Sequence, residues 1–261
     1  MFVRRRHGVE LTDAGRLLLE QARKVLGAAE EAQEAIDRYL SQRQAEGRTI
    51  RLAVIPTLSG LLTTRMLAAA AHALPGCRLH IQELYARESR ALVEAGELDF
   101  SITLPSSNRE NDILAYEELY YVYSPASAVE PTEPITMKDV AAQPLILPSS
   151  KASLLREYLD TICASRMVEL KVVLEIDGVL PRKESVVAGL GSTILPMAAI
   201  SNEVASGSLI ARPVTPPLVR PIILDQRKGM EPRVASQMRA IVAGILFETG
   251  YLTADAPLAP A

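Results

Sequence analysis

Apolar residues recur at helical spacing along the first part of the chain. No proline interrupts the sequence from Thr12 to about Arg43, and one narrow stripe repeats at alternating intervals of four and three residues, as in a coiled coil. The stripe consists of Leu18, Ala22, Val25, Ala29, Ala32, Ile36 and Tyr39. A helix of roughly 45–50 Å with so narrow a stripe favours pairing with a second copy. Packing of the helix against its own domain is the alternative.

A short basic segment precedes this helix. Arg4, Arg5, Arg6 and His7 are followed by Gly8 and by the alternating residues Val9–Leu11. Glycine between two short apolar-ended runs predicts a small β-hairpin. Thr12 is then a suitable helix N-cap, because its hydroxyl can accept a hydrogen bond from the first turn.

After residue 47 the pattern changes to alternating strands and helices. In the first part, strands are expected over 49–55, 78–84, 98–104 and 120–123, with helices over 60–73 and 89–95. A capping box, Thr136 with Asp139, opens the second part. Strands are expected there over 145–147, 171–176, 192–195, 209–214 and 222–224, and helices over 153–165, 183–188, 202–205 and 233–247. This alternation predicts an α/β fold with parallel strands and helical crossovers.

Composition and charge narrow the class of protein. The net charge is −3, so any contact with nucleic acid must come from a local basic patch. Cys77 and Cys163 lie far apart and have no metal-type spacing, which favours reduced thiols in a cytoplasmic protein. The N-terminus lacks the apolar run of a secretory signal. No apolar stretch reaches the length of about 18 residues that a membrane span needs.

Three segments together resemble LysR-type transcriptional regulators. Phe2–Arg5 with Val9–Gly15 is similar to the end of the family's winged helix-turn-helix and the start of its linker helix. The segment Leu92–Ile102 is similar to the family's L-x-x-G-x-L-D motif, and Val187–Pro196 to its V-x-x-G-x-G-x-x-L-P motif. Each match alone is weak, but their order and spacing cover nearly the whole chain. The nitrogen-assimilation-control subgroup is the most similar.

The resemblance implies an architecture. It comprises a wing remnant over 1–11, a dimerising linker helix over 12–46 and two Rossmann-like lobes of the type 2 periplasmic-binding-protein fold. Lobe I takes residues 47–124 and 226–261, and lobe II takes 125–225. Relatives form homodimers or homotetramers. The family's recognition helix precedes the position of Phe2, so a shortened chain, a mis-assigned start and a natural regulator without a DNA reader are all open.

DNA contact is expected only through phosphates. Arg4, Arg5 and Arg6 could touch the backbone beside a wing, which positions a protein without reading bases. In the full-length family architecture such contacts are expected. For this chain alone a solvated basic tip is favoured, and base-specific binding is not expected without a recognition helix.

Hydroxyl residues follow three of the expected strands. In open α/β lobes, ligands bind at the carboxyl ends of strands, where helix N-termini point their amides into the crevice. The candidate ligand-binding residues are Thr57, Ser59, Thr103, Ser149 and Ser150, and the resemblance puts the family's effector cleft at these junctions. Each hydroxyl could instead cap its own helix. Arg182 and Lys183 could neutralise an anionic effector or lie on a solvated surface.

Catalysis finds little support. The three histidines, His7, His72 and His80, have no neighbouring arrangement of a nucleophile and an acid. We therefore expect neither an enzyme nor a metal or cofactor site. The favoured function is a transcriptional regulator that senses a small, organic, anionic effector between its lobes. A stand-alone cytosolic binding protein of the same fold, without DNA binding, is the alternative.

Overall fold

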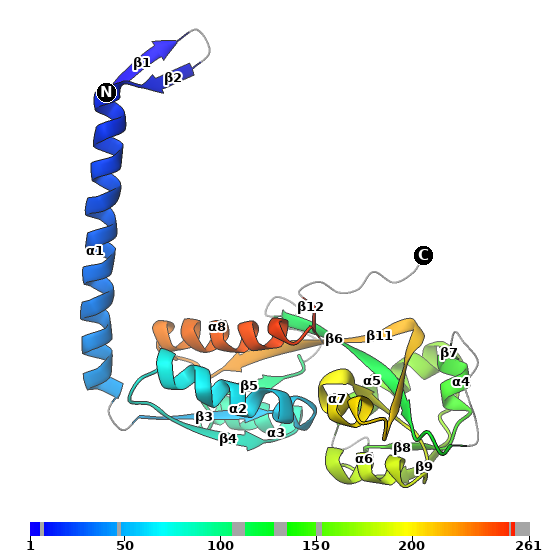
Figure 1. The fold of residues 1–261 in the computed structure, drawn as a ribbon. Helices are drawn as coiled ribbons and strands as arrows, with labels where there is room; N and C mark the ends of the chain where they lie inside the picture. The colour runs from blue at the N-terminus through cyan, green and yellow to red at the C-terminus, as the bar shows by residue number, and fades with distance from the viewer. Residues whose placement is uncertain are drawn as a thin grey trace. The chain divides into compact units, whose positions relative to one another are not determined.

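The fold is described from a computed structural model of the chain (Figure 1). It describes residues 1–5, 8–45, 48–105, 113–127, 135–149, 153–250 and 252–253. The chain divides into two compact units. One contains residues 1–48 and 75–77, and the other contains residues 49–74 and 78–261.

The first unit contains the expected hairpin and long helix. Strands β1 (Phe2–Arg5) and β2 (Gly8–Leu11) pair antiparallel. Helix α1 (Asp13–Ala45) follows. The hydroxyl of Thr12 accepts a hydrogen bond from the amide of Gly15 at 3.1 Å, which confirms Thr12 as the cap.

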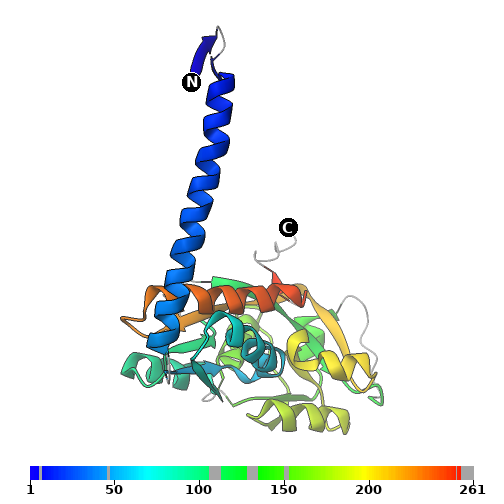
Figure 2. The same ribbon diagram turned by 60° about the vertical axis from the view of Figure 1, so that its left-hand side comes forward.

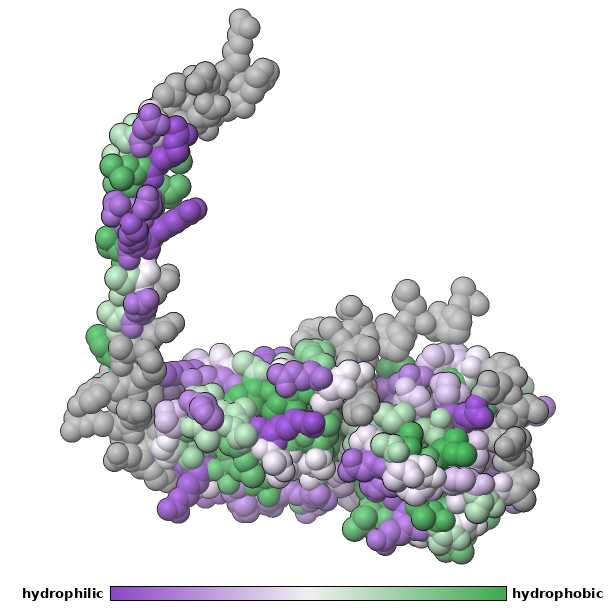
Figure 3. All heavy atoms as spheres, viewed as in Figure 1, coloured by the Kyte–Doolittle hydropathy of each residue, from purple (hydrophilic) through white to green (hydrophobic). Residues whose placement is uncertain are grey.

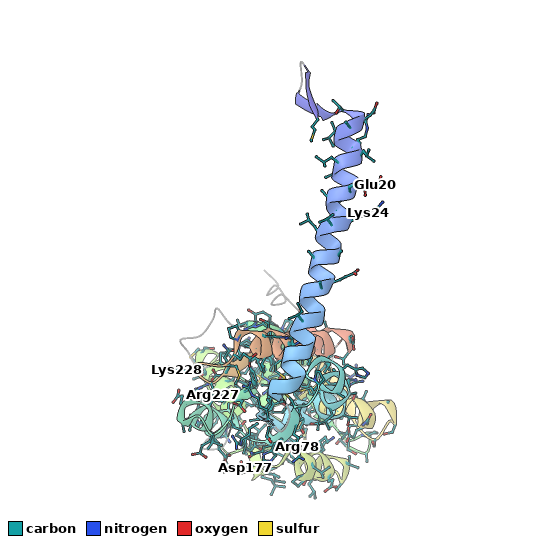
Figure 4. The ribbon with its side chains drawn as sticks, turned by 90° about the vertical axis from the view of Figure 1, so that its left-hand side faces the viewer. Glu20, Lys24, Arg78, Asp177, Arg227 and Lys228 are labelled. Atoms are coloured by element: carbon teal, nitrogen blue, oxygen red, sulfur yellow. The ribbon has the colours of Figure 1, made fainter. Side chains whose placement is uncertain are left out.

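The apolar stripe of α1 is exposed within a single chain. Leu18, Val25 and Ile36 expose 47%, 68% and 54% of their surface, and hydrophobic side chains gather along one edge of the helix in Figure 3. Glu20 and Lys24 project together from the helix (Figure 4) and form an ion pair at 2.7 Å. The side chain of Tyr39 lies outside the described residues. Such exposure is compatible with pairing to a second copy, and the pairing of two helices stays a prediction.

The second unit contains a mixed sheet. Its order is β10-β6-β11-β5-β3-β4. Strands β3 (Thr49–Val54), β4 (Arg78–Glu83) and β5 (Phe100–Thr103) run parallel, as expected. Strand β6 (Ile113–Tyr123) pairs antiparallel with both β11 (Ile210–Gln226) and β10 (Thr193–Pro196), and β11 pairs antiparallel with β5. The short strand β12 (Leu252–Thr253) pairs with β6.

Helices cover the sheet in two groups (Figures 1 and 2). The first lobe has α2 (Pro56–Ala73), α3 (Ala86–Ala95) and α8 (Pro232–Glu248), with α2 packed against α8. The second lobe has α4 (Met137–Ala141), α5 (Leu154–Ser165), α6 (Val179–Val187) and α7 (Met197–Ala205). Its parallel pair is β8 (Leu145–Leu147) and β9 (Val172–Glu175), and β7 (Ile135–Thr136) pairs with β11.

Strands β6 and β11 are longer than the sequence predicts. Two strands were expected over 209–214 and 222–224, separated by prolines, but β11 is continuous from Ile210 to Gln226. The register against β6 shifts between Pro213 and Leu218, and such an irregularity accommodates residues that cannot donate a ladder hydrogen bond. The two strands therefore run through both lobes and connect them.

The core of the second lobe lies on both faces of β6. Leu119, Tyr121 and Tyr123 pack with residues of α4 and α5, whereas Val122 packs with residues of α6 and α7. Side chains alternate between the two faces of a strand, and here both faces are covered. Leu119 therefore packs in the core of the second lobe, and the expected lobe boundary at residue 124 stays a prediction.

Two glycines shape the turn between α6 and β10. Gly189 has a φ of 76°, in the left-handed region that favours glycine. A Cβ on Gly191 would lie 2.8 Å from the carbonyl oxygen of Pro144, so a side chain there would collide with the backbone. The Gly-x-Gly segment thus forms a tight helix-to-strand turn, as predicted.

Candidate functional site

Four helices begin around one small cavity between the lobes. Its volume is about 30 Å³. The first residues of α2, α3, α5 and α6 line it, together with the end of β5 and one residue of β11. The lining consists of Ile55, Pro56, Thr57, Tyr85, Ala86, Leu104, Ser153, Leu154, Leu155, Val179, Arg182 and Arg220. Because helix N-termini carry partial positive charge, this convergence favours an anion.

Arg182 is the largest charged group in the lining. It lies in the first turn of α6 and is 2% exposed. One terminal nitrogen donates to the carbonyl oxygen of Ile176 at 3.2 Å, but Nε has no hydrogen-bond partner. No described carboxylate forms an ion pair with Arg182. Burial lowers the pKa of Arg182 to about 10, so the guanidinium is charged at neutral pH and only partly compensated.

Arg220 is buried beside Arg182 but has a carboxylate partner. Its Nε donates to Oε1 of Glu117 at 2.6 Å, and its Nη2 donates to the hydroxyl of Thr57 at 2.9 Å. Oε2 of Glu117 has no partner. Burial raises the pKa of Glu117, and the charge of Arg220 lowers it in part. The ion pair thus holds Thr57 at the start of α2, whereas the charge of Arg182 is offset only in part, by the nearby carboxylate of Asp177.

A larger hollow adjoins this cavity. It has a volume of about 800 Å³ and lies among α2, α6 and α7. It shares Pro56, Thr57 and Val179 with the small cavity. Lys183 lines the larger hollow, but its ammonium is paired with Glu203 at 2.6 Å. The hollow thus offers space for the body of a ligand whose charged end lies in the cavity.

Two contacts link the lobes at the rim of the cavity. The hydroxyl of Tyr85, which precedes α3, donates to the backbone carbonyl of Asp177, which precedes α6. Arg87 of α3 forms an ion pair with Glu157 of α5. Helix α2 also packs against α7. These contacts hold the lobes in one relative orientation.

The predicted ligand-binding residues fall in different surroundings. Thr57 lines the cavity. Ser59 is buried within α2, where its hydroxyl lies 3.4 Å from that of Thr63. Thr103 is fully buried and its hydroxyl has no partner. The backbone of Ser149 donates to the Asp177 carboxylate at 2.8 Å, and Ser150 lies outside the described residues. Of the four that the structure describes, only Thr57 lines this cavity.

Sequence reasoning missed Arg220, Tyr85 and Ser153. Ser153 caps α5 by accepting from the amide of Leu155 at 3.2 Å. The sequence contains a signal for Arg220, which is a lone charge within the apolar run Leu218–Leu224 of a strand. A charge buried in such a strand needs a partner or a function. Arg182 was weighed as solvated or effector-binding, and its burial excludes the solvated surface.

Other predictions concern the N-terminal arginines and metals. The side chains of Arg4 and Arg5, and the whole of Arg6, lie outside the described residues, so phosphate contact stays a prediction. Within the described residues, no cluster of His, Cys, Asp or Glu could hold a metal ion. Across those same residues, no helix has the length and apolar character of a membrane span.

Comparison with known proteins gives one answer. The model of the LysR substrate-binding domain family matches residues 43–244. The regulator BbuR of Bordetella bronchiseptica is 27% identical, over 92% of this chain and 77% of its own length. The nitrogen assimilation regulatory protein Nac of Klebsiella aerogenes is 26% identical over 76% of this chain, which spans only 64% of Nac.

Solved structures agree on the fold. A full-length OxyR variant from Pseudomonas aeruginosa superposes with a TM-score of 0.66 at 21% identity, over 92% of this chain and 80% of that one. CbnR, a LysR family regulator, superposes with a TM-score of 0.60 at 19% identity, over 93% of this chain and 84% of that one. Both match the two-lobed fold of periplasmic-binding-protein type. The chain belongs to the family of LysR-type transcriptional regulators and contains the substrate-binding domain of that family.

Proposed function

We propose that this chain senses a small organic anion in the cleft between its lobes. The observation that carries the proposal is the cavity at which four helices begin and in which Arg182 is buried without a carboxylate partner among the described residues. Burial of an unpaired charge is costly, and an anionic ligand would offset that cost. Thr57, held by Arg220, would contact the ligand from the first lobe.

Sensing requires that the ligand distinguish two states of the protein. A cavity of about 30 Å³ has room for little more than a water molecule or two. An organic effector therefore has to part the lobes or extend into the adjoining hollow. A ligand shifts the orientation of the lobes only by its difference in affinity for the two orientations.

The output of this shift is control of transcription in the cytoplasm. In the proposed assembly, two copies pair through α1, and the change in lobe orientation passes to a DNA-binding domain through α1 and the β1–β2 hairpin. Arg4, Arg5 and Arg6 would contact phosphates there, which positions the protein without reading bases.

The test begins with a thermal-shift screen of small metabolites, followed by calorimetry on the effector it finds. Thr57→Ala should weaken effector binding up to about tenfold, because a candidate hydrogen bond is lost, and should leave the protein folded. The matched control is Thr161→Ala, which removes a hydroxyl of α5 that bonds to its own helix. Unchanged affinity in the cleft variant would count against this pocket.

A further inference from the structure

The residues that line the cavity between the lobes have more positive than negative charge. Arg182 and Arg220 both line it. Glu117 lies within 2.5 Å of Arg220 and pairs with it. No described acidic residue lines the cavity, and the carboxylate of Asp177, labelled in Figure 4, accepts from the backbone of Ser149 and is exposed. Within the lining, the charge of Arg182 is therefore unbalanced, and the nearby carboxylate of Asp177 offsets it only in part.

Unpaired hydrogen-bond donors at the cavity also favour an anionic ligand. Nε of Arg182 is buried and has no acceptor. Helices α2, α3 and α6 start at the cavity without a side-chain cap on their N-termini. A guanidinium edge and free helix N-termini are the donors that a planar pair of anionic oxygens accepts from.

Apart from the hydroxyl residues Thr57, Tyr85 and Ser153, the remainder of the lining is apolar. Ile55, Leu104, Leu154, Leu155 and Val179 surround the donors. A dianion would bring one charge more than the cavity can balance, and burial of an unbalanced charge is costly. A single carboxylate on a short apolar chain matches both the charge and the walls.

We infer that the cavity takes the head group of a small organic monocarboxylate, with one carboxylate oxygen accepting from Nε of Arg182. This inference rests on the proposed function and names the chemical class of the effector. Arg182 sets the charge of the ligand that binds, whereas the Arg220–Glu117 pair positions Thr57.

The test compares sodium propionate with propionamide, its neutral isostere, and with succinate and inorganic phosphate. Each is titrated at constant ionic strength, with the midpoint of thermal unfolding as the readout. Propionate should raise the midpoint most. Arg182→Gln should weaken the apparent affinity for propionate about ten- to a hundredfold. Arg182→Lys, which keeps the charge but lacks Nε, should weaken it less.

Arg166→Gln is the matched control, because Arg166 is an exposed arginine at the end of α5, and it should respond as the unchanged protein does. Equal responses to propionate and propionamide would overturn the inference. It would also be overturned by a stronger response to phosphate or succinate, by no response to any probe, or by an unchanged response in a folded Arg182→Gln or Arg182→Lys variant.

The two proposals fail separately. A neutral effector whose affinity depends on Thr57 but not on Arg182 would refute the carboxylate and leave cleft sensing intact. A carboxylate that binds through Arg182 without altering the lobes would support the inference and refute the proposed signalling.

Discussion

Burial of the charged Arg182 side chain in the cavity destabilises the folded state. Burial lowers the pKa of Arg182 to about 10, which corresponds to about 3 kcal/mol against the charged form. The hydrogen bond to Ile176 offsets part of this. An apolar residue would pack well at this position. A buried arginine that destabilises the fold there is better explained by ligand binding than by a structural role.

Arg182→Met should therefore stabilise the ligand-free protein. The expected gain in the free energy of unfolding is about 1 to 3 kcal/mol at pH 7, measured by urea denaturation. Leu180→Met, at an exposed position on the same helix, is the control and should change stability by less than about 0.5 kcal/mol. A loss of stability in Arg182→Met would show that the guanidinium holds the fold together.

Glu117 gives the protein a pH dependence of definite sign. Its pKa is raised from 4.5 by burial, so the folded state binds the proton more tightly than the unfolded state. Its contribution to stability is then fully present below the unfolded pKa and decreases as pH rises through the folded pKa.

The difference in unfolding free energy between the unchanged protein and Glu117→Gln should therefore shrink as pH rises above the unfolded value of 4.5. Denaturation curves at several pH values across this window measure it. A difference that grows with pH would mean that Arg220 lowers the pKa of Glu117 more than burial raises it.

Among the elements, α1 has a surface with no partner within the described part of the chain. Substitution of its exposed valine by a charged residue tests the seam. Val25→Asp should weaken self-association about a hundredfold, since each of two valines stabilises a dimer by about 1.5 kcal/mol or more. Sedimentation equilibrium measures this. Arg23→Asp, outside the stripe, is the control. A monomeric unchanged protein at tens of micromolar would refute the pairing.

The rim contact between Tyr85 and Asp177 opposes opening of the lobes. Tyr85→Phe removes the donated hydrogen bond and should lower the free energy of unfolding by about 1 kcal/mol. If the effector needs a wider cavity, the same change should tighten its binding up to about fivefold, measured by calorimetry. Weaker binding would instead identify Tyr85 as a ligand contact.

Helices and parallel strands of the second unit were predictable because their patterns are local. The β3-α2-β4-α3-β5 order follows from apolar runs and breakers. The extent of β6 and the continuity of β11 were not predictable, because β6 is covered on two faces and β11 contains Pro213, Pro216, Pro217 and Pro221. Their pairing depends on residues far apart in the chain, such as Glu117 and Arg220.

For the whole molecule, the sequence predicted the family and the location of a cleft more readily than the residues within it. Thr57 follows a strand, and a strand end is visible in one sequence. Arg182 and Arg220 come from different elements and meet only when the lobes fold. That is why the sequence offers the charge of this cavity only as one of two options at Arg182, and at Arg220 gives no more than a lone charge within an apolar run.

Binding of the effector between the lobes, at the helix starts around Arg182, can be tested by amide chemical-shift mapping on the isotope-labelled protein. With saturating effector, we expect the largest shifts at residues 55–60, 85–89, 153–157 and 179–183, with smaller changes along β6 and β11. Shifts confined to the exposed surface of α8 or to α1, with none at those four helix starts, would contradict it.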